Sequence, residues 1–265
     1  MIGKLLASRY RLISGLGEGA SGVVFRADDL QRRSSVALRI LRPELAASPA
    51  IEAALRGRIA QREAIEVAAP GALEGLVDVI DIGRSDEHLF VVTPYIAGES
   101  LEVLLRRSGR LPWSRVQALA LGLCQRLDAC HRAGVVHGSL QLRHCFVSQG
   151  TSRGGIEIVA TGIEPLLVEL GGPLADAIAP ALAAYAAPEQ VSGDACDHRV
   201  DLYALGVCLY ELLCGERPFT EANPKRLGAM HMLTPPPPLG ERLRGGTIPA
   251  PVEAAIMRLL SKSPD

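Results

Sequence analysis

A glycine-rich segment near the amino terminus has the residue types and spacing of a phosphate-binding turn. Gly17, Gly19 and Gly22 follow the pattern Gly-x-Gly-x-x-Gly, and Val24 follows two residues later. Glycine lacks a Cβ atom, so its backbone can turn tightly and its amides can approach phosphate oxygens. The segment therefore predicts binding of a phosphorylated molecule, and an ordinary glycine turn is the alternative interpretation.

Strands are predicted next to this segment. Residues 10–41 predict strands separated by turns, and the segments 23–25 and 36–40 are the richest in strand-forming side chains. In a dinucleotide-binding fold, a helix would follow the glycines directly. Because a strand follows here, the sequence predicts a glycine-rich hairpin and disfavours a dinucleotide-binding fold.

The remaining chain changes from strands to helices. Hydrophobic spacing and turn residues predict a helix over 49–67, strands over 76–82 and 89–93, helices over 101–107 and 112–133, two short strands flanking 150–155, a loop, and helices over 199–214 and 252–260. This order predicts an α+β fold of two lobes, with a strand-rich lobe over residues 1–95 and a helical lobe over residues 96–265.

Composition excludes several classes of function. The chain has 265 residues, a net charge of −1 and no long block of one charge, so we expect no nucleic-acid partner. Its six cysteines form no Cys-x-x-Cys pair, which disfavours zinc and disulfides and indicates a reducing compartment. No apolar run reaches the length of a membrane span, so we expect a cytoplasmic location.

Residues 134–144, Gly-Val-Val-His-Gly-Ser-Leu-Gln-Leu-Arg-His, resemble the catalytic loop His-Arg-Asp-Leu-Lys-Pro-x-Asn of protein kinases. Further segments resemble other kinase motifs in the family's order: Val36-Ala37-Leu38-Arg39, the hinge over 90–101, Ala187-Pro188-Glu189, and residues 201–206. From Tyr10 onward the chain is therefore similar to bacterial members of the eukaryotic-type Ser/Thr protein kinase family. The resemblance implies the bilobal protein kinase-like fold.

The positions that carry chemistry in this family hold other residues here. The resemblance keeps positions that support the fold, namely His137, Gly162 and Asp201. The replaced positions are Arg39 for the phosphate-contacting Lys, Gly138 for the Arg before the catalytic Asp, Ser139 for that Asp, Gln141 for the catalytic-loop Lys, and His144 and Ala160 for the magnesium-binding Asn and Asp.

The rate losses expected from these replacements lead to an expectation about function. A missing general base costs about 10²–10⁴ in rate, and a typical kinase turns over at about 1–100 s⁻¹. Loss of the magnesium ligands removes several kcal/mol more of charge stabilisation, although the two losses are not simply additive. We therefore expect a pseudokinase, not an enzyme, that acts by binding proteins, such as active kinases or a receptor, in a regulatory or scaffolding role.

Individual replacements have milder interpretations. Arg39 keeps a positive charge and could pair with Glu63 of the predicted helix, with Glu66 as the second choice. His144 could bind a metal, but a single histidine without its acidic partner favours a hydrogen-bonded structural role, and we expect no metal site.

Two carboxylates lie near the replaced Asp. For Glu157 and Glu164 the sequence position favours solvated faces over catalytic roles. The segment from Ile163 to Ala184 contains no Ser, Thr or Tyr, so activating phosphorylation has no acceptor within it, and Leu182 stands at a family Thr position. This segment could present a docking surface or form a disordered linker.

The resemblance also implies a vestigial nucleotide pocket. Val24 and Ala37 would form its roof and Phe146 its floor, and the carbonyl of Pro94 and the amide of Ile96 would be the hinge contacts. We expect that no cofactor is required and that any ATP binding is weak and independent of magnesium. Phe146 is larger than the aliphatic residue usual at this position and would crowd an adenine ring.

Two further hypotheses remain beside the pseudokinase. One is a nucleotide-binding switch without turnover, and the other is a low-activity Ser/Thr kinase that uses displaced groups such as Glu164 or His144. The last residues, 261–265, resemble the Lys-Asp-Pro that precedes a family arginine, the partner of the glutamate at the Glu189 position. We therefore expect the domain to be truncated at its carboxyl end.

Overall fold

A computed structural model describes residues 1–19, 21–148, 155–243 and 247–264. The chain divides into two compact units, one formed by Met1–Ala97 with Val159–Ala177 and the other by Gly98–Ile158 with Ile178–Asp265. The prediction of an α+β fold is confirmed, because most strands lie in the first unit and most helices in the second. No helix among the described residues is long and apolar enough to span a membrane.

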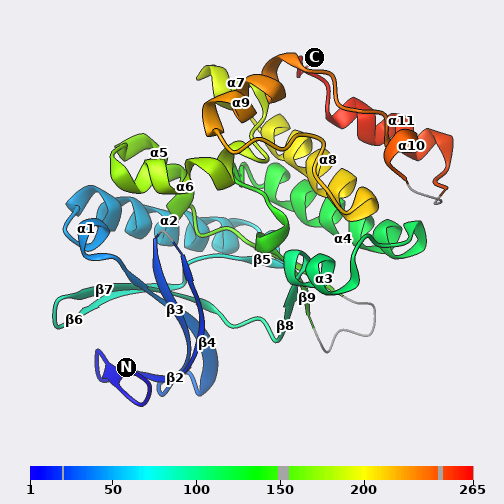
Figure 1. Cartoon of the computed structure of the whole chain (residues 1–265). Helices are drawn as coiled ribbons and strands as arrows, with labels where there is room; N and C mark the ends of the chain where they lie inside the picture. The colour runs from blue at the N-terminus through cyan, green and yellow to red at the C-terminus, as the bar shows by residue number, and fades with distance from the viewer. Residues whose placement is uncertain (20, 149–154, 244–246, 265) are drawn as a thin grey trace. The chain divides into compact units, whose positions relative to one another are not determined.

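The first unit is built on an antiparallel sheet in the order β1-β2-β3-β4-β7-β6 (Figure 1). Its strands are β1 (Leu5–Leu6), β2 (Tyr10–Gly19), β3 (Gly22–Asp29), β4 (Ser34–Leu41), β6 (Asp81–Ser85) and β7 (His88–Pro94), and the short strand β5 (Leu76–Val77) also lies in this unit. One face of the sheet packs into a core that includes Tyr10, Leu38 and Phe90.

The other face of the sheet carries three residues singled out from the sequence. Burial alternates along β4, where Leu38 and Ile40 are buried and Ala37 and Arg39 are half-buried. Val24 lies directly opposite Arg39 in the register of β3 and β4, and cross-strand partners share a face. Val24, Ala37 and Arg39 therefore lie on the face opposite to the core.

Gly22 begins β3 for a steric reason. Its φ is +148°, and a Cβ atom there would lie 2.0 Å from the carbonyl oxygen of Ile40. A side chain at this position would collide with the backbone of β4, so the third glycine of the motif is required for the hairpin to pack.

The helices of the first unit are α1 (Pro43–Ala46), α2 (Pro49–Ala68) and α5 (Ile163–Leu170). Ile51 and Leu55 are buried on α2, Arg58 and Arg62 are half-buried, and Glu63 is exposed. Residues at positions i, i+4, i+7 and i+11 share one face of a helix. Ile51, Leu55, Arg58 and Arg62 therefore share one face of α2. Helix α2 also contacts α5 (Figure 1).

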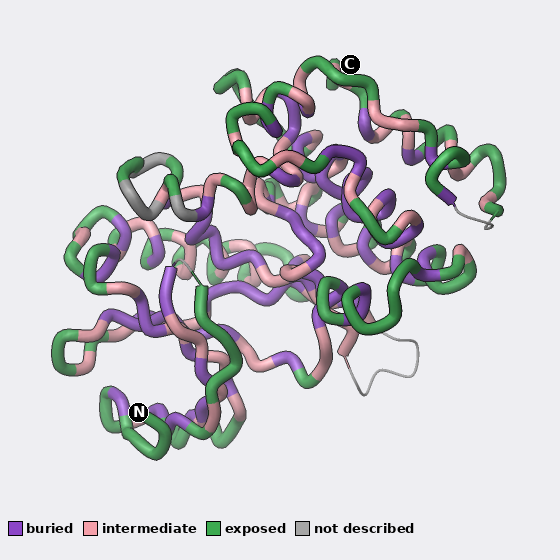
Figure 2. The backbone as a smooth tube through the Cα atoms, viewed as in Figure 1, coloured by how far each residue is buried: buried purple, intermediate pink, exposed green. Residues whose placement is uncertain are grey.

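The second unit is mainly helical. Its elements are β8 (Gly98–Ser100), α3 (Leu101–Ser108), α4 (Trp113–Arg132), η1 (Leu142–His144), β9 (Cys145–Ser148), α7 (Pro188–Ser192), α8 (Arg199–Cys214), α9 (Pro224–Leu233), α10 (Leu239–Arg242) and α11 (Ala250–Leu259). Two elements reach the unit boundary, β10 (Ile156–Val159), which pairs with β9, and α6 (Pro173–Ala183). Helix α8 is almost completely buried, as Figure 2 shows, and forms the centre of this unit.

Two sequence expectations about local structure are wrong. The single strand predicted over 76–82 is divided into β5 and β6, because residues 78–80 leave the ladder and the Asp78 carboxylate bonds the backbone amide of Val79. The segment 163–184, expected to be a loop or a linker, forms α5 and α6. Its Ala and Leu residues have high helix propensity, and buried Ile163 and Leu167 hold α5 in place.

Candidate functional site

Arg39 lies between the glycine-rich hairpin and the start of α5. Its Nη1 atom donates a 2.6 Å hydrogen bond to the hydroxyl of Ser21 and lies 3.8 Å from Oε1 of Glu164. Both side chains of the ion pair are mostly shielded from solvent, so it is screened less than a surface pair. The hairpin thus places a guanidinium beside the glycine turn.

The predicted pairing of Arg39 with Glu63 is wrong. Glu63 is exposed on α2, and the carboxylate within ion-pair distance of Arg39 belongs to Glu164. Glu66, the second choice, accepts a hydrogen bond from the backbone amide of Gly71. Glu63 lies outside the more buried face of α2, which the order of motifs along the chain could not show.

Glu164 is buried, which contradicts the expectation of a solvated face. Only 8% of the residue is exposed, and it lies in the first turn of α5. A carboxylate there is stabilised by the helix dipole as well as by Arg39. Glu157, the other carboxylate near Ala160, is half-buried on β10.

Arg58 is a site residue that the sequence interpretation missed. Its Nη2 atom donates to the carbonyl oxygen of Ala160 at 2.8 Å and to Oδ2 of Asp78 at 3.2 Å. Burial raises the pKa of the Asp78 carboxyl, although Arg58 and the backbone amide of Val79 act in the opposite direction. The spacing of Ile51, Leu55 and Arg58 on one helical face was the signal that could have identified it.

The buried carboxylate of Asp201 binds the start of the loop from His137 to His144. The Asp201 carboxylate accepts hydrogen bonds from the backbone amides of His137 and Gly138 at 2.9 and 2.8 Å, and Nε2 of His131 lies 2.8 Å from the same group. Asp201 is 1% exposed, in the first turn of α8. One buried carboxylate therefore fixes the backbone at His137 and Gly138.

His144 takes its orientation from the same loop. Nε of Arg143 donates to Nε2 of His144 at 3.3 Å, and Nδ1 of His144 lies 2.8 Å from the carbonyl oxygen of Ser139. Because the arginine must donate, Nε2 is the acceptor and the ring proton belongs on Nδ1. The ring also stacks on His137 at a centroid distance of 5.6 Å.

Two other replaced positions of the loop, Gln141 and Gly138, take part in its backbone structure. Gln141 is buried, its carbonyl oxygen accepts from the amide of His144, and its side-chain Nε2 has no hydrogen-bond partner in the described chain. Gly138 has a φ of +72°, a conformation that an arginine would adopt only with strain. Its carbonyl oxygen accepts a hydrogen bond from Gln190 of α7.

The residues of the predicted nucleotide pocket are distributed over both units. Pro94 ends β7 and Ile96 is buried, and both belong to the first unit with Val24 and Ala37. Phe146 lies on β9 in the second unit, between Ser100 and Glu157 in the sheet register. The pocket itself stays a prediction.

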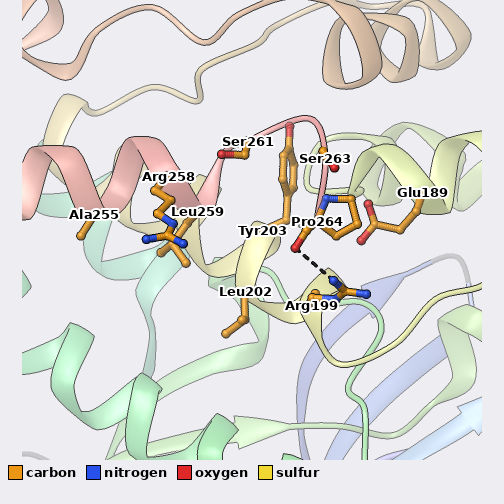
Figure 3. Close-up of a pocket in the computed structure, with 10 residues that line it drawn as sticks. All are labelled: Glu189, Arg199, Leu202, Tyr203, Ala255, Arg258, Leu259, Ser261, Ser263 and Pro264. Carbon is orange, nitrogen blue, oxygen red and sulfur yellow. Dashed lines mark hydrogen bonds between the residues drawn. The ribbon is translucent and has the colours of Figure 1, made fainter.

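A cavity of about 370 Å³ lies in the second unit (Figure 3). Glu189, Arg199 and Tyr203 line it together with residues of α11 and the segment 261–264, and Arg199 donates a hydrogen bond to the carbonyl oxygen of Pro264 at 3.1 Å. None of the replaced catalytic positions lines this cavity, so we do not assign the site to it.

The described residues contain no group of three or more His, Cys, Asp or Glu side chains placed to hold a metal ion. Magnesium prefers oxygen ligands in near-octahedral geometry. His144 would offer a nitrogen that Arg143 already contacts, and Ala160 offers no side-chain ligand. Arg39 and Ser21, in contrast, fit phosphate oxygens.

Comparison with known proteins gives relatives along the whole chain. Serine/threonine-protein kinase pkn3 of Myxococcus xanthus is 32% identical over 268 residues, covering 99% of this chain and 48% of the relative. PknB of Mycobacterium tuberculosis is 29% identical, covering 98% of this chain and 41% of the relative. The crystal structure of the M. tuberculosis PknI kinase domain is 25% identical, with a TM-score of 0.68, and the match covers 100% of this chain and 91% of the PknI chain.

These relatives contradict the prediction that the chain is not an enzyme. They carry the name of serine/threonine-protein kinases and match almost every part of the chain. The replaced residues at Arg39, Ser139, Gln141, His144 and Ala160 are facts of the sequence, but they do not outweigh this finding.

Protein kinases use ATP together with magnesium ions, which conflicts with the prediction of metal-independent ATP binding. The residues at the two metal positions do not fit magnesium, whereas the glycine hairpin and Arg39 fit the nucleotide phosphates. The chain spans about half or less of the length of these curated relatives.

The protein kinase domain matches residues 10–235 of this chain. The strand-rich first unit and the helical second unit agree with the two lobes of that fold. The chain therefore belongs to the protein kinase family and is similar to its bacterial Ser/Thr members.

Proposed function

We propose that this chain is a Ser/Thr protein kinase domain that binds ATP and transfers its terminal phosphoryl group slowly, with non-standard residues at the catalytic positions. Membership of the family and the names of the relatives support phosphotransfer. The residues at the replaced positions support a low rate. A proton acceptor other than the family's Asp, together with the lost magnesium ligands, predicts a turnover below the usual range of about 1–100 s⁻¹.

The observation that carries this proposal is the position of Arg39. It projects from β4 on the same face as Val24 and Ala37 and is hydrogen-bonded to Ser21 at the glycine hairpin. A guanidinium there can donate two hydrogen bonds to phosphate oxygens. Two of its contacts, a hydroxyl and a carboxylate 3.8 Å away, are with groups that a phosphate can replace.

His144 is the group that we propose as proton acceptor. In the step, the substrate hydroxyl oxygen bonds to the terminal phosphorus, the bond to the bridging oxygen breaks, and ADP leaves. The hydroxyl proton goes to Nε2 of His144, the acceptor nitrogen of the ring, which must first part from Nε of Arg143. Asp201 keeps the loop backbone in position during this step.

The Arg39→Met variant should transfer phosphate at least about tenfold more slowly than the unmodified chain, because a charge-assisted contact to phosphate contributes about 1.5–3 kcal/mol. The measurement is incorporation of γ-labelled phosphate into Ser and Thr of the chain and of a generic basic protein, with the modified residues identified by mass spectrometry.

Arg11→Met is the matched control, because Arg11 is an exposed arginine on β2 of the same sheet. It should leave the rate unchanged. Equal incorporation by the chain and by Arg39→Met, or no incorporation above a blank purification, would overturn the proposed function.

The His144→Gln variant should lower turnover by about 10²-fold and leave ATP affinity unchanged, because glutamine keeps a hydrogen-bonding amide but cannot accept the proton. Single-turnover rates and nucleotide titration separate the two quantities. His88→Gln, at the start of β7, is the control. A turnover equal to that of the unmodified chain would exclude His144 as the acceptor.

We also propose a regulatory protein-binding role beside phosphotransfer, with active kinases or a receptor as partners and a cytoplasmic location. The segment 163–184 supports it, because it lacks hydroxyl acceptors yet forms α5 and α6, and Val168 on α5 is 55% exposed. The six free cysteines agree with a reducing compartment.

A further inference from the structure

Arg58 places a positive charge beside the residue that stands at the family's metal-binding Asp position. The family's Asp position is Ala160, and Nη2 of Arg58 bonds the carbonyl oxygen of Ala160 at 2.8 Å. The guanidinium also lies against Gly162, where three of its atoms would be 2.5–2.6 Å from a Cβ atom. Gly162 has a φ of +65°, so both space and backbone conformation reserve this position for glycine.

Asp78 fixes the guanidinium in this place. Its Oδ2 atom lies 3.2 Å from Nη2 of Arg58, its other oxygen accepts from the backbone amide of Val79, and the residue is 5% exposed. The Nε atom of Arg58 is buried without a hydrogen-bond partner among the described residues. About a quarter of the Arg58 side chain nevertheless stays exposed.

The charges around Arg58 favour an anion over a cation. Among the described residues of the first unit, Arg39 lies on β4 and pairs with Glu164 of α5, while Arg58 and Arg62 share one face of α2, which contacts α5, and Arg58 pairs with Asp78. Arg62 acts on Asp78 electrostatically, and its buried Nε has no hydrogen-bond partner in the described chain. A divalent cation would be repelled by guanidinium groups here, and a triphosphate would be attracted.

We propose that Arg58, together with Arg39, supplies the positive charge that magnesium supplies elsewhere in the family, so that this chain binds nucleoside triphosphate without a divalent metal. The inference rests on the proposed function in one respect, because ATP is the ligand of that function. It explains the misfit between the family's metal and the residues at Ala160 and His144.

The experiment is a titration with a fluorescent ATP analogue in EDTA, in magnesium and in manganese. The unmodified chain should bind in EDTA with a dissociation constant within about threefold of that in either metal. Arg58→Gln should weaken binding in EDTA by about tenfold or more, because it removes a charge-assisted contact. Arg58→Lys should recover part of that affinity because it keeps the charge.

Arg56→Gln is the matched control. Arg56 is exposed on the opposite side of α2, where it pairs with Glu52, and its removal should change the affinity in EDTA by less than about twofold. The melting temperature of each variant shows whether it is folded. If Arg58→Gln does not fold, the metal dependence of the unmodified chain and the behaviour of Arg58→Lys decide the question.

The outcomes separate this inference from the proposed function. Binding that needs magnesium or manganese and is unchanged in Arg58→Gln overturns the metal-free site and leaves the kinase proposal standing. Absence of binding in all three solutions overturns both. Metal-free binding without phosphotransfer supports the Arg58 site and contradicts the slow kinase.

Discussion

Replacing Asp201 with alanine should destabilise the chain by about 3–5 kcal/mol, the largest effect expected for any single substitution here. The carboxylate is 1% exposed and accepts from the backbone amides of His137 and Gly138, with His131 as its third partner. Alanine would leave the buried amide of His137, the half-buried amide of Gly138 and the imidazole of His131 without this acceptor. The free energy of unfolding in urea, followed by the fluorescence of Trp113, measures the loss.

Amide hydrogen exchange distinguishes loss of the loop from general destabilisation. In Asp201→Asn, which keeps one oxygen acceptor, protection at His137 and Gly138 should fall more than protection in the core of α8. Asp128→Ala is the control, because Asp128 is exposed on α4 and forms a surface ion pair with Arg132 four residues later. A change of less than about 1 kcal/mol in Asp201→Ala would contradict the anchoring role.

Acid should destabilise the chain through His231, by about 3 kcal/mol between pH 7 and pH 4. Burial lowers the pKa of His231 from 6.5 to about 4, with Lys262 and Arg217 acting in the same direction. The folded state thus favours the neutral ring, whose Nδ1 lies 2.9 Å from the hydroxyl of Tyr203. The contribution is complete above pH 6.5 and is lost as the pH falls through 4.

Urea unfolding at several pH values tests this dependence by comparison with His231→Asn. Asparagine offers a polar atom near the position of Nδ1 but does not titrate, so the free-energy difference from the unmodified chain should shrink by about 3 kcal/mol as the pH falls from 7 to 4. His88→Asn should give a curve parallel to that of the unmodified chain. Parallel curves for His231→Asn would show that this residue does not cause the acid sensitivity.

The sequence was sufficient for features that depend on neighbours along the chain. Three local patterns are the alternation of apolar and polar side chains along β4, the glycine hairpin, and the apolar spacing along α4 and α8. The structure contains the strand, the hairpin and the two helices that these patterns predict. Motif spacing was also sufficient for the family, because the glycines, residues 134–144 and Ala187-Pro188-Glu189 occur in a fixed order.

Contacts between distant segments could not be predicted in the same way. The partner of Arg39 depends on how α2 is rotated and on whether residues 163–170 form a helix, and both are set by packing. A charge pattern on one helix gives several candidate partners, of which the sequence favoured Glu63. The structure places Glu164 beside Arg39 and Arg58 beside Ala160 instead.

The sequence alone determined which residues occupy the catalytic positions, because a motif is a property of order along the chain. Only the tertiary structure decided which charges meet, because ion pairs form between side chains that packing brings within about 4 Å. A serine at position 139 and an alanine at position 160 are visible in the sequence. The guanidinium held against that alanine is visible only once α2 and α5 are packed together.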